Sequence, residues 1–261
     1  MSPSEPSVTW LTAFLDHPAD GPHEEAVAFW RAVTGAGLSA RRGPTGAFAT
    51  LVPADGDPYL RVQRLDADPA SAGCPDPRVH LDLHVADPGV ATESAVRLGA
   101  TVLARPGGPG GHVVLASPAG VVWCLVPDRD QRGAVVPTPP VSAAGRAQVD
   151  QVAVDVGPAA FDAELAFWQA VTGAERTPTS SPEFARLQLP GTALHLLLHR
   201  LDEDRSAGLH VDLSCDDRAA EVARHVRLGA EVVAQQRSWT VLRDPAGLVY
   251  CVTDRPVRER P

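Results

Sequence analysis

The sequence lacks the long apolar runs, basic clusters and secretory leader that mark several large classes of protein. No apolar stretch approaches the roughly 20 residues needed to span a bilayer, so no membrane partner is expected. The formal net charge is −9 at pH 7, and the basic residues are almost all scattered arginines, which excludes electrostatic binding of nucleic acid. The N-terminus has no basic patch followed by an apolar core, so the sequence predicts no signal peptide.

Paired cysteines and nucleotide-binding motifs are also missing. The four cysteines show neither CxxC pairing nor the spacing of a zinc ribbon, which predicts a reducing, cytoplasmic location. No GxSxG elbow, Walker A loop or Rossmann fingerprint occurs. The Gly-rich run 107–111 is irregular and lies between two expected strands, so we interpret it as a flexible lip and not as a phosphate loop.

What the sequence does contain is an internal repeat. The 261 residues have an ordinary globular composition, with 44% hydrophobic and 21% charged residues. Five short segments recur in the same order, and the spacing between copies changes only in stretches rich in Gly, Pro, Ser or Asp. The matching segments are AFWRAVTG (28–35) and AFWQAVTG (166–173), RLDAD (64–68) and RLDED (200–204), HLDL (80–83) and HVDL (210–213), VRLGA (96–100 and 226–230), and VLASPAG (114–120) and VLRDPAG (241–247).

Each copy predicts the element order strand, helix, strand, strand, strand, twice over. A helix is expected from Pro22 to Thr34, stopped at Gly35, with its counterpart stopped at Gly173. Asp87 is expected to cap a second helix that ends at Gly99. The strands of the first copy are expected at 11–15, 48–52, 59–65 and 78–85 and near 101, 113 and 121, with one strand of the first module weaker than the others.

The repeat divides the chain into two domains of two modules each. The first domain is predicted at 1–127, with modules 1–68 and 78–127. A Pro- and Ala-rich linker covers 128–147. The second domain is predicted at 148–255, with modules 148–204 and 208–255. Because the chain already carries four modules, we expect the two copies to pack as an internal pseudo-dimer in a monomer, with a homodimer as the alternative.

The strand at 78–85 separates apolar from polar side chains by strict alternation. Neighbouring side chains of a strand point to opposite faces, so one face is expected under the helices and the other toward a concave cavity. The apolar face consists of Val79, Leu81, Leu83 and Val85, and the polar face includes His80, Asp82 and His84. In the second copy the polar positions are His210, Asp212 and Ser214.

The module order, the Phe-Trp pair on the first helix, the segment RVHLDL and the closing segment DPAGLVYC resemble the vicinal-oxygen-chelate superfamily. This superfamily includes glyoxalases, bleomycin-resistance proteins and dioxygenases, and the likeness is greatest to tandem glyoxalase-like domains common in actinobacteria. The resemblance covers nearly the whole chain. It implies an α+β fold in which paired βαβββ modules form half-open β-barrels, each around a cavity with the helices outside.

The resemblance also implies metal-ligand positions. In the first copy they fall at Thr9, Gln63, His80 and Cys124, and in the second at Gln148, His199, His210 and Cys251. Active members usually have carboxylates at two of these positions, and both copies lack them. Two imidazoles and a thiol in the second copy nevertheless suit Zn²⁺ or a similar divalent ion. The alternative for His80 and His210 is a polar cavity wall in which each pairs with its neighbouring Asp, and for the cysteines a small buried hydrophobe.

Further residues are expected to line the cavities and contact a small organic ligand. These cavity candidates are Gln63, His80, Asp82, His84, Cys124, Asp150, His195, Asp212 and Trp239. Three functions remain open. The first is a binding protein that captures a small molecule, with degenerate metal sites and a resistance or sequestration role. The second is a metal-dependent lyase, isomerase or dioxygenase that uses the second-copy site. The third is an interaction scaffold without a ligand.

Overall fold

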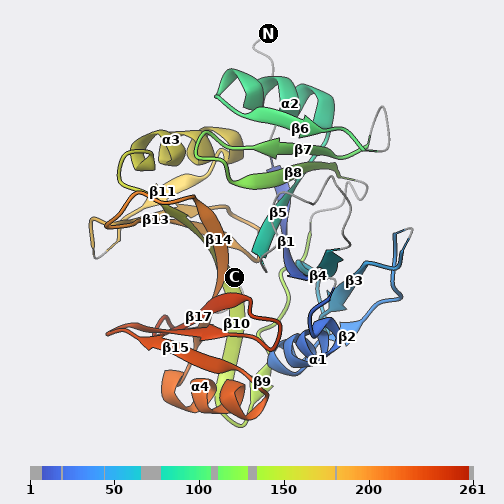
Figure 1. The fold of residues 1–261 in the computed structure, drawn as a ribbon, viewed down its shortest axis with the longest axis vertical. Coiled ribbons are helices and arrows are strands. Elements are labelled where there is room, and N and C mark those ends of the chain that lie inside the picture. The colour runs from blue at the N-terminus through green and yellow to red at the C-terminus, as the bar shows by residue number, and fades with distance from the viewer. Residues whose placement is uncertain are drawn as a thin grey trace. The chain divides into compact units, whose positions relative to one another are not determined.

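A computed structural model describes residues 8–18, 20–43, 45–65, 78–106, 111–128, 134–179 and 181–258 of the chain (Figure 1). The last three residues of the repeated segment RLDAD (66–68) and most of the predicted lip at 107–111 lie outside these residues. The first copy consists of β1 (Val8–Pro18), α1 (His23–Thr34), β2 (Gly37–Leu38), β3 (Phe48–Val52), β4 (Leu60–Leu65), β5 (Arg78–Val85), α2 (Pro88–Arg97), β6 (Thr101–Ala104), β7 (Val113–Ala116) and β8 (Val122–Pro127).

The second copy repeats the same order of elements. It consists of β10 (Gly145–Val156), α3 (Phe161–Thr172), β11 (Glu175–Thr177), β12 (Phe184–Gln188), β13 (His195–Arg200), β14 (Gly208–Cys215), α4 (Arg218–Arg227), β15 (Glu231–Gln235), β16 (Trp239–Arg243) and β17 (Val249–Thr253). The short strand β9 (Val141–Ser142) pairs with β10. The predicted module order is therefore confirmed, and β2, two residues long, is the weak strand of the first module.

Each copy builds one mixed sheet that does not close into a barrel. The first sheet has the strand order β2-β3-β4-β1-β5-β8-β7-β6, and the second β11-β12-β13-β10-β14-β17-β16-β15. In each sheet the first strand of the second module runs parallel to the last strand, as β5 does to β8 and β14 to β17. This parallel contact places side chains of the two strands in register, and it organises the site described below.

The compact units of the structure do not follow the two copies. One unit contains Met1–Ala13, His80–Val135 and Val152–Leu209, and the other contains Phe14–Val79, Val136–Gln151 and His210–Pro261. Each unit therefore combines a module of the first copy with a module of the second. We call them the inner unit, which holds the second and third modules, and the outer unit, which holds the first and fourth.

Aromatic residues that pack between helix and sheet form part of the core of each unit. In the inner unit Trp168 of α3 is fully buried, and its ring centroid lies 5.6 Å from that of Trp123 on β8. The indole Nε1 of Trp168 donates to the buried carboxylate of Glu164 at 2.8 Å. In the outer unit Trp30 of α1 lies 5.0 Å from the ring of Tyr250 on β17. A helix of one copy thus packs on a strand of the other in both units.

The two first-module helices end in left-handed glycines, as predicted. Gly35 and Gly173 both have φ of +65°, a conformation that a Cβ disfavours. No heavy atom lies within 4 Å of a Cβ built on Gly173, so backbone strain alone decides the effect there. We expect Gly173→Ala to lower the free energy of unfolding by about 1 kcal/mol in denaturant titration. Gly208→Ala is the control, because its surroundings are equally open and its φ is not positive; equal stability of the two variants would contradict the cap.

Candidate functional site

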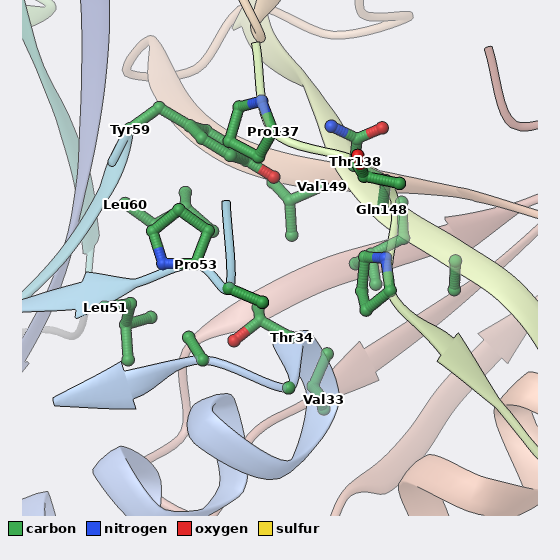
Figure 2. Close-up of a pocket in the computed structure, with 16 residues that line it drawn as sticks. Val33, Thr34, Leu51, Pro53, Tyr59, Leu60, Pro137, Thr138, Gln148 and Val149 are labelled. Carbon is green, nitrogen blue, oxygen red and sulfur yellow. The ribbon is translucent and has the colours of Figure 1, made fainter. Parts of the chain in front are cut away.

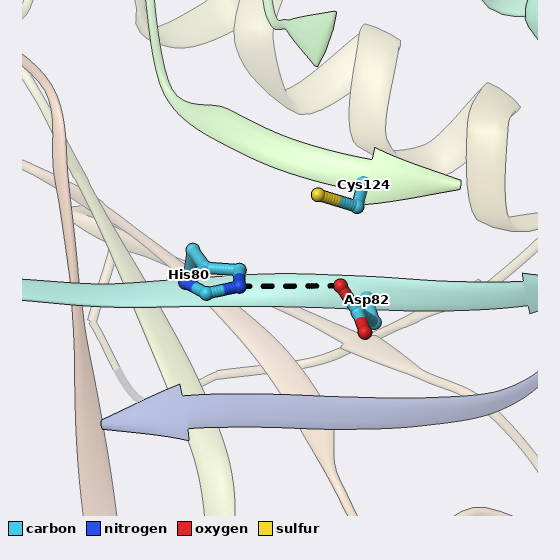
Figure 3. Close-up of side chains that lie close together, drawn as sticks. All are labelled: His80, Asp82 and Cys124. Carbon is cyan, nitrogen blue, oxygen red and sulfur yellow. Dashed lines mark ion pairs between the residues drawn. The ribbon is translucent and has the colours of Figure 1, made fainter. Parts of the chain in front are cut away.

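The polar face of β5 forms a compact group of three potential metal ligands with β8. The ligand atoms of His80, Asp82 and Cys124 all lie within 4.8 Å of one another. Asp82 is opposite Cys124 in the parallel β5–β8 register, and His80 lies two residues earlier on the same face of β5 (Figure 3). His80 Nε2 is 4.0 Å from Asp82 Oδ1. We call this the first His–Asp–Cys group, and it lies wholly within the inner unit.

The second copy reproduces this group in the outer unit. His210, Asp212 and Cys251 again place one ligand atom each within 4.8 Å of the others, and Asp212 is opposite Cys251 in the β14–β17 register. His210 Nε2 is only 3.2 Å from Asp212 Oδ1. In addition, Gln151 Nε2 on β10 donates to Asp212 Oδ2 at 2.6 Å. The second His–Asp–Cys group is therefore tighter than the first and carries an extra amide.

The carboxylate of Asp212 is held ionised although it is buried. Burial acts to raise its pKa, but the neighbouring His210 and then Arg255 and Gln151 outweigh burial, so the pKa of Asp212 lies below its ordinary value. Arg255 itself forms a bidentate pair with the buried Asp150, at 2.7 and 3.2 Å. The site thus contains two buried carboxylates, Asp212 and Asp150, and each has a basic side chain beside it.

Two of the second-copy candidates occupy other surroundings. Gln148 is buried and forms a side-chain hydrogen bond with Tyr59. His199 belongs to the inner unit, where its Nδ1 lies 2.8 Å from Asp155 Oδ1 and its ring lies against Phe184, with centroids 4.8 Å apart. The groups of ligand atoms found in the described residues include neither of them.

The remaining candidates are distributed along both sheets. His84 Nε2 lies 3.0 Å from Thr12 Oγ1, and the hydroxyl of Thr9 donates to the carbonyl of His84 at 3.2 Å. Gln63 is half-buried on β4 opposite Phe48. His195 is buried at the start of β13, and Trp239 is half-buried at the start of β16.

Sequence reasoning missed two ligand-type residues at the second group. Asp212 was predicted to line the cavity and not to join the ligand set, although strand alternation already placed it on the face of His210. Gln151 was not singled out, because strand alternation places it on the face of β10 opposite the candidates Gln148 and Asp150. Its counterpart at the repeat spacing set by the helices is Ala13, so a comparison of the two copies at this position was the available signal.

The donor atoms present fit a borderline transition metal. Imidazole nitrogen, carboxylate oxygen and thiolate sulfur are the three ligand types that Zn²⁺ takes in proteins, and three protein ligands leave a coordination position for water or ligand. Hard ions such as Mg²⁺ prefer oxygen ligands throughout. In each copy the Asp two residues after the His places a carboxylate beside the imidazole and the thiol.

Comparison with known proteins gives consistent results. The glyoxalase-like domain family matches residues 13–126 and 151–253. The Mn(II)-bound glyoxalase from Novosphingobium aromaticivorans has 16% identity and a TM-score of 0.64, with 95% of this chain and 82% of that chain covered. The 2,3-dioxygenase LapB from Pseudomonas sp. KL28 has 13% identity and a TM-score of 0.58, with 98% and 94% covered. An extradiol ring-cleaving dioxygenase from B. fuscum has 13% identity and a TM-score of 0.59, with 98% and 75% covered.

No curated protein sequence matches the chain. Among the described residues, no helix is both long and apolar enough to cross a membrane. Four βαβββ modules in two mixed sheets share the fold of this glyoxalase and these dioxygenases, as the resemblance to the vicinal-oxygen-chelate superfamily implied. Within it, the chain belongs to the glyoxalase-like domain family, which it matches in both copies.

Proposed function

We propose that the protein binds a small oxygen-bearing organic molecule through one divalent metal ion, Zn²⁺ or similar, held by His210, Asp212 and Cys251. The observation that carries this proposal is the recurrence of the same His–Asp–Cys group at the same strand contact in both copies. A polar surface that binds nothing would not require a thiol beside the carboxylate in both copies. The thiol must be reduced to bind a metal, in keeping with the cytoplasmic location expected from the sequence.

Each residue of the second group has a defined task in this proposal. His210 and Cys251 supply nitrogen and sulfur, and Asp212 supplies an anionic oxygen whose orientation is fixed by the 2.6 Å hydrogen bond from Gln151. Such an outer hydrogen bond typically changes metal affinity by 10- to 100-fold when it is removed. A bound ion would act as a Lewis acid toward an oxygen atom of the ligand. Arg255 and Asp150 compensate one another's charge at the edge of the group.

Capture or sequestration of the ligand is the function that needs the fewest additional groups, and it is the one we favour. It requires a metal, a cavity and no proton transfer. We further propose that the chain acts as a monomer, since each compact unit already pairs a module of one copy with a module of the other.

A metal-dependent lyase, isomerase or dioxygenase is the second candidate. One observation favours a reaction that transfers a proton: His199 is half-exposed, and Asp155 lies 2.8 Å from its Nδ1. A carboxylate at this distance fixes the tautomer and the orientation of the ring.

Titration of Zn²⁺ into metal-free protein tests the metal site. We expect wild type to bind, and His210→Ala to lose at least tenfold in affinity because one of three donors is removed. His80→Ala should lose less, since its His–Asp contact is 4.0 Å against 3.2 Å and Ala13 stands where the second copy has Gln151. His112→Ala, which removes an exposed imidazole, is the control and should bind as wild type does. Absence of binding by the folded wild type, or equal losses in His210→Ala and His80→Ala, would contradict the proposal.

A further inference from the structure

A second, chemically different cavity lies within the outer unit. Its volume is about 80 Å³, and it is enclosed by the end of α1, strands β3, β4 and β10, and the segment 137–140 that joins the two copies (Figure 2). All of its lining residues belong to the outer unit. At roughly 10–15 Å³ for each water-sized position, this volume corresponds to about five to eight such positions.

The walls of this cavity are predominantly apolar. Val33, Leu51, Leu60, Val149 and Leu213 contribute aliphatic side chains. Water in such surroundings finds few hydrogen-bond partners, whereas an apolar ligand replaces it favourably at about 25 cal/mol per Å² of buried apolar surface. The walls therefore favour a hydrocarbon ring or short chain over a highly polar metabolite.

Two buried polar side chains give the cavity one point of recognition. Tyr59 and Gln148 are 8% and 6% exposed, and their side chains are hydrogen-bonded to each other. Burial, opposed only in part by that hydrogen bond, keeps the pKa of Tyr59 far above its ordinary value, so the phenol stays neutral. An amide offers two N–H donors and a carbonyl with two acceptor positions. The pair can therefore orient a hydroxyl or carbonyl group that enters the cavity.

The charge near this polar pair selects against anions. The carboxylate of Asp150 acts on Tyr59 and contributes to raising its pKa, and the lining contains no Lys or Arg. An anionic ligand would be desolvated without a compensating cation, which is strongly unfavourable. The cavity is thus suited to a neutral ligand.

The segment that covers the cavity is attached by a local polar contact. Thr138 donates both its backbone N–H and its hydroxyl to the carboxylate of Asp55, at 2.7 and 2.6 Å. Pro137 and Pro140 flank this contact and line the cavity. Because the contact is exposed, its net contribution is small, on the order of 1 kcal/mol. The backbone N–H of Ala147 also donates to the carbonyl of Pro140 at 3.3 Å, so the segment is held at its middle and at its end.

We propose that this cavity is a binding site for a small, neutral, largely apolar molecule with one hydroxyl or carbonyl group, of which phenol is the simplest probe. It requires no metal and is distinct from the second His–Asp–Cys group, because Leu213 points to the face of β14 opposite Asp212. Its test is therefore carried out on chelator-treated protein, where the outcome does not depend on the metal proposal.

The experiment is a titration of phenol and of benzoate, followed by ¹H–¹⁵N shifts of the Gln148 side-chain amide and of the Gly35 backbone. We expect saturable shifts with phenol and at least tenfold weaker binding of benzoate. Ala54→Phe, at the exposed rim, should abolish the phenol shifts, whereas Ala40→Phe, at an exposed position outside the lining, should leave them unchanged. Tyr59→Phe should weaken binding several-fold. Shifts that are absent in wild type, that persist in Ala54→Phe, or that benzoate reproduces equally would overturn the proposal.

Discussion

Replacing Asp244 by Ala is expected to lower the free energy of unfolding by about 3–5 kcal/mol, the range for removing one partner of a buried charged network. The carboxylate is buried at 4% exposure and accepts four hydrogen bonds. Its Oδ2 accepts from Trp30 Nε1 at 2.8 Å and lies 3.1 Å from His17 Nε2. Its Oδ1 accepts from the backbone N–H groups of Ala246 and Leu248 at 2.8 and 2.9 Å.

The loss is large because Ala leaves every one of these donors buried. Trp30 and His17 are both fully excluded from solvent, so water cannot replace the carboxylate without opening the core. The same change also removes the side-chain contacts that hold the turn between β16 and β17. Since Trp30 and His17 come from the first module and Asp244 from the fourth, the substitution weakens the contact between modules in the outer unit.

Urea titration followed by tryptophan fluorescence measures this effect. Asp20→Ala, which removes an exposed carboxylate, is the matched control and should change stability by less than about 0.5 kcal/mol. Asp244→Asn keeps the shape but replaces one acceptor oxygen with a donor, and should fall between wild type and Asp244→Ala. A loss below 1 kcal/mol for Asp244→Ala would show that the network does not stabilise the fold.

The fold was predictable because it depends on local patterns that occur twice. The α1 helix was predicted to end at Thr34 and does so, because Gly35 has the positive φ that stops a helix cheaply. Asp87 was predicted to cap α2, and its carboxylate accepts from the backbone N–H groups of Gly89 and Val90. The alternation in β5 correctly separated buried Val79 and Leu81 from the polar face.

The contacts between distant modules were not predictable in this way. Nothing in the spacing of His17 and Asp244 indicates that they meet, because they are separated by most of the chain and belong to different copies. The two copies also solve the same packing problem with different residues, since Trp168 donates to Glu164 of its own helix whereas Trp30 donates to Asp244. A repeat predicts the helices and strands that both copies share, but it does not predict that equivalent side chains hydrogen-bond to different residues. The His–Asp–Cys groups lie between these cases. Alternation aligned His80 with Asp82, and the family resemblance grouped His80 with Cys124, but the contact of Asp82 with Cys124 follows only from the strand order.

The free energy of unfolding is also expected to decrease as the pH falls from about 6.5 to 4, because one buried histidine, His23, takes up a proton more readily in the unfolded chain. His23 is 3% exposed, and its pKa is lowered to about 4 from an ordinary value of 6.5, first by burial and then by His17 and Arg41, against a smaller opposing effect of Glu24. Above pH 6.5 His23 is neutral in both the folded and the unfolded chain. Below it, the unfolded chain binds a proton that the folded chain rejects until about pH 4, so folding becomes less favourable.

The hydrogen-bond network explains why the folded protein rejects this proton. Arg41 can only donate, so His23 Nε2, 3.2 Å from Arg41 Nη1, must accept. His23 Nδ1 then carries the single proton and donates to His17 Nδ1 at 3.2 Å. His17 in turn donates from Nε2 to Asp244. The contact with Arg41 thereby favours the neutral form of His23, because a second proton on His23 would place an N–H against the Arg41 guanidinium.

The measurement is the free energy of unfolding of wild type and His23→Gln between pH 8 and pH 4. Carboxylates also titrate in this range, so the difference between the two proteins isolates the histidine. We expect wild type to be the more stable at pH 8 and its advantage to shrink by up to about 1.4 kcal/mol for each unit of pH below 6.5. His112→Gln, at an exposed ring, should show no such change. A difference between wild type and His23→Gln that stays constant with pH would mean that His23 accepts its proton as readily in the folded chain as in the unfolded one.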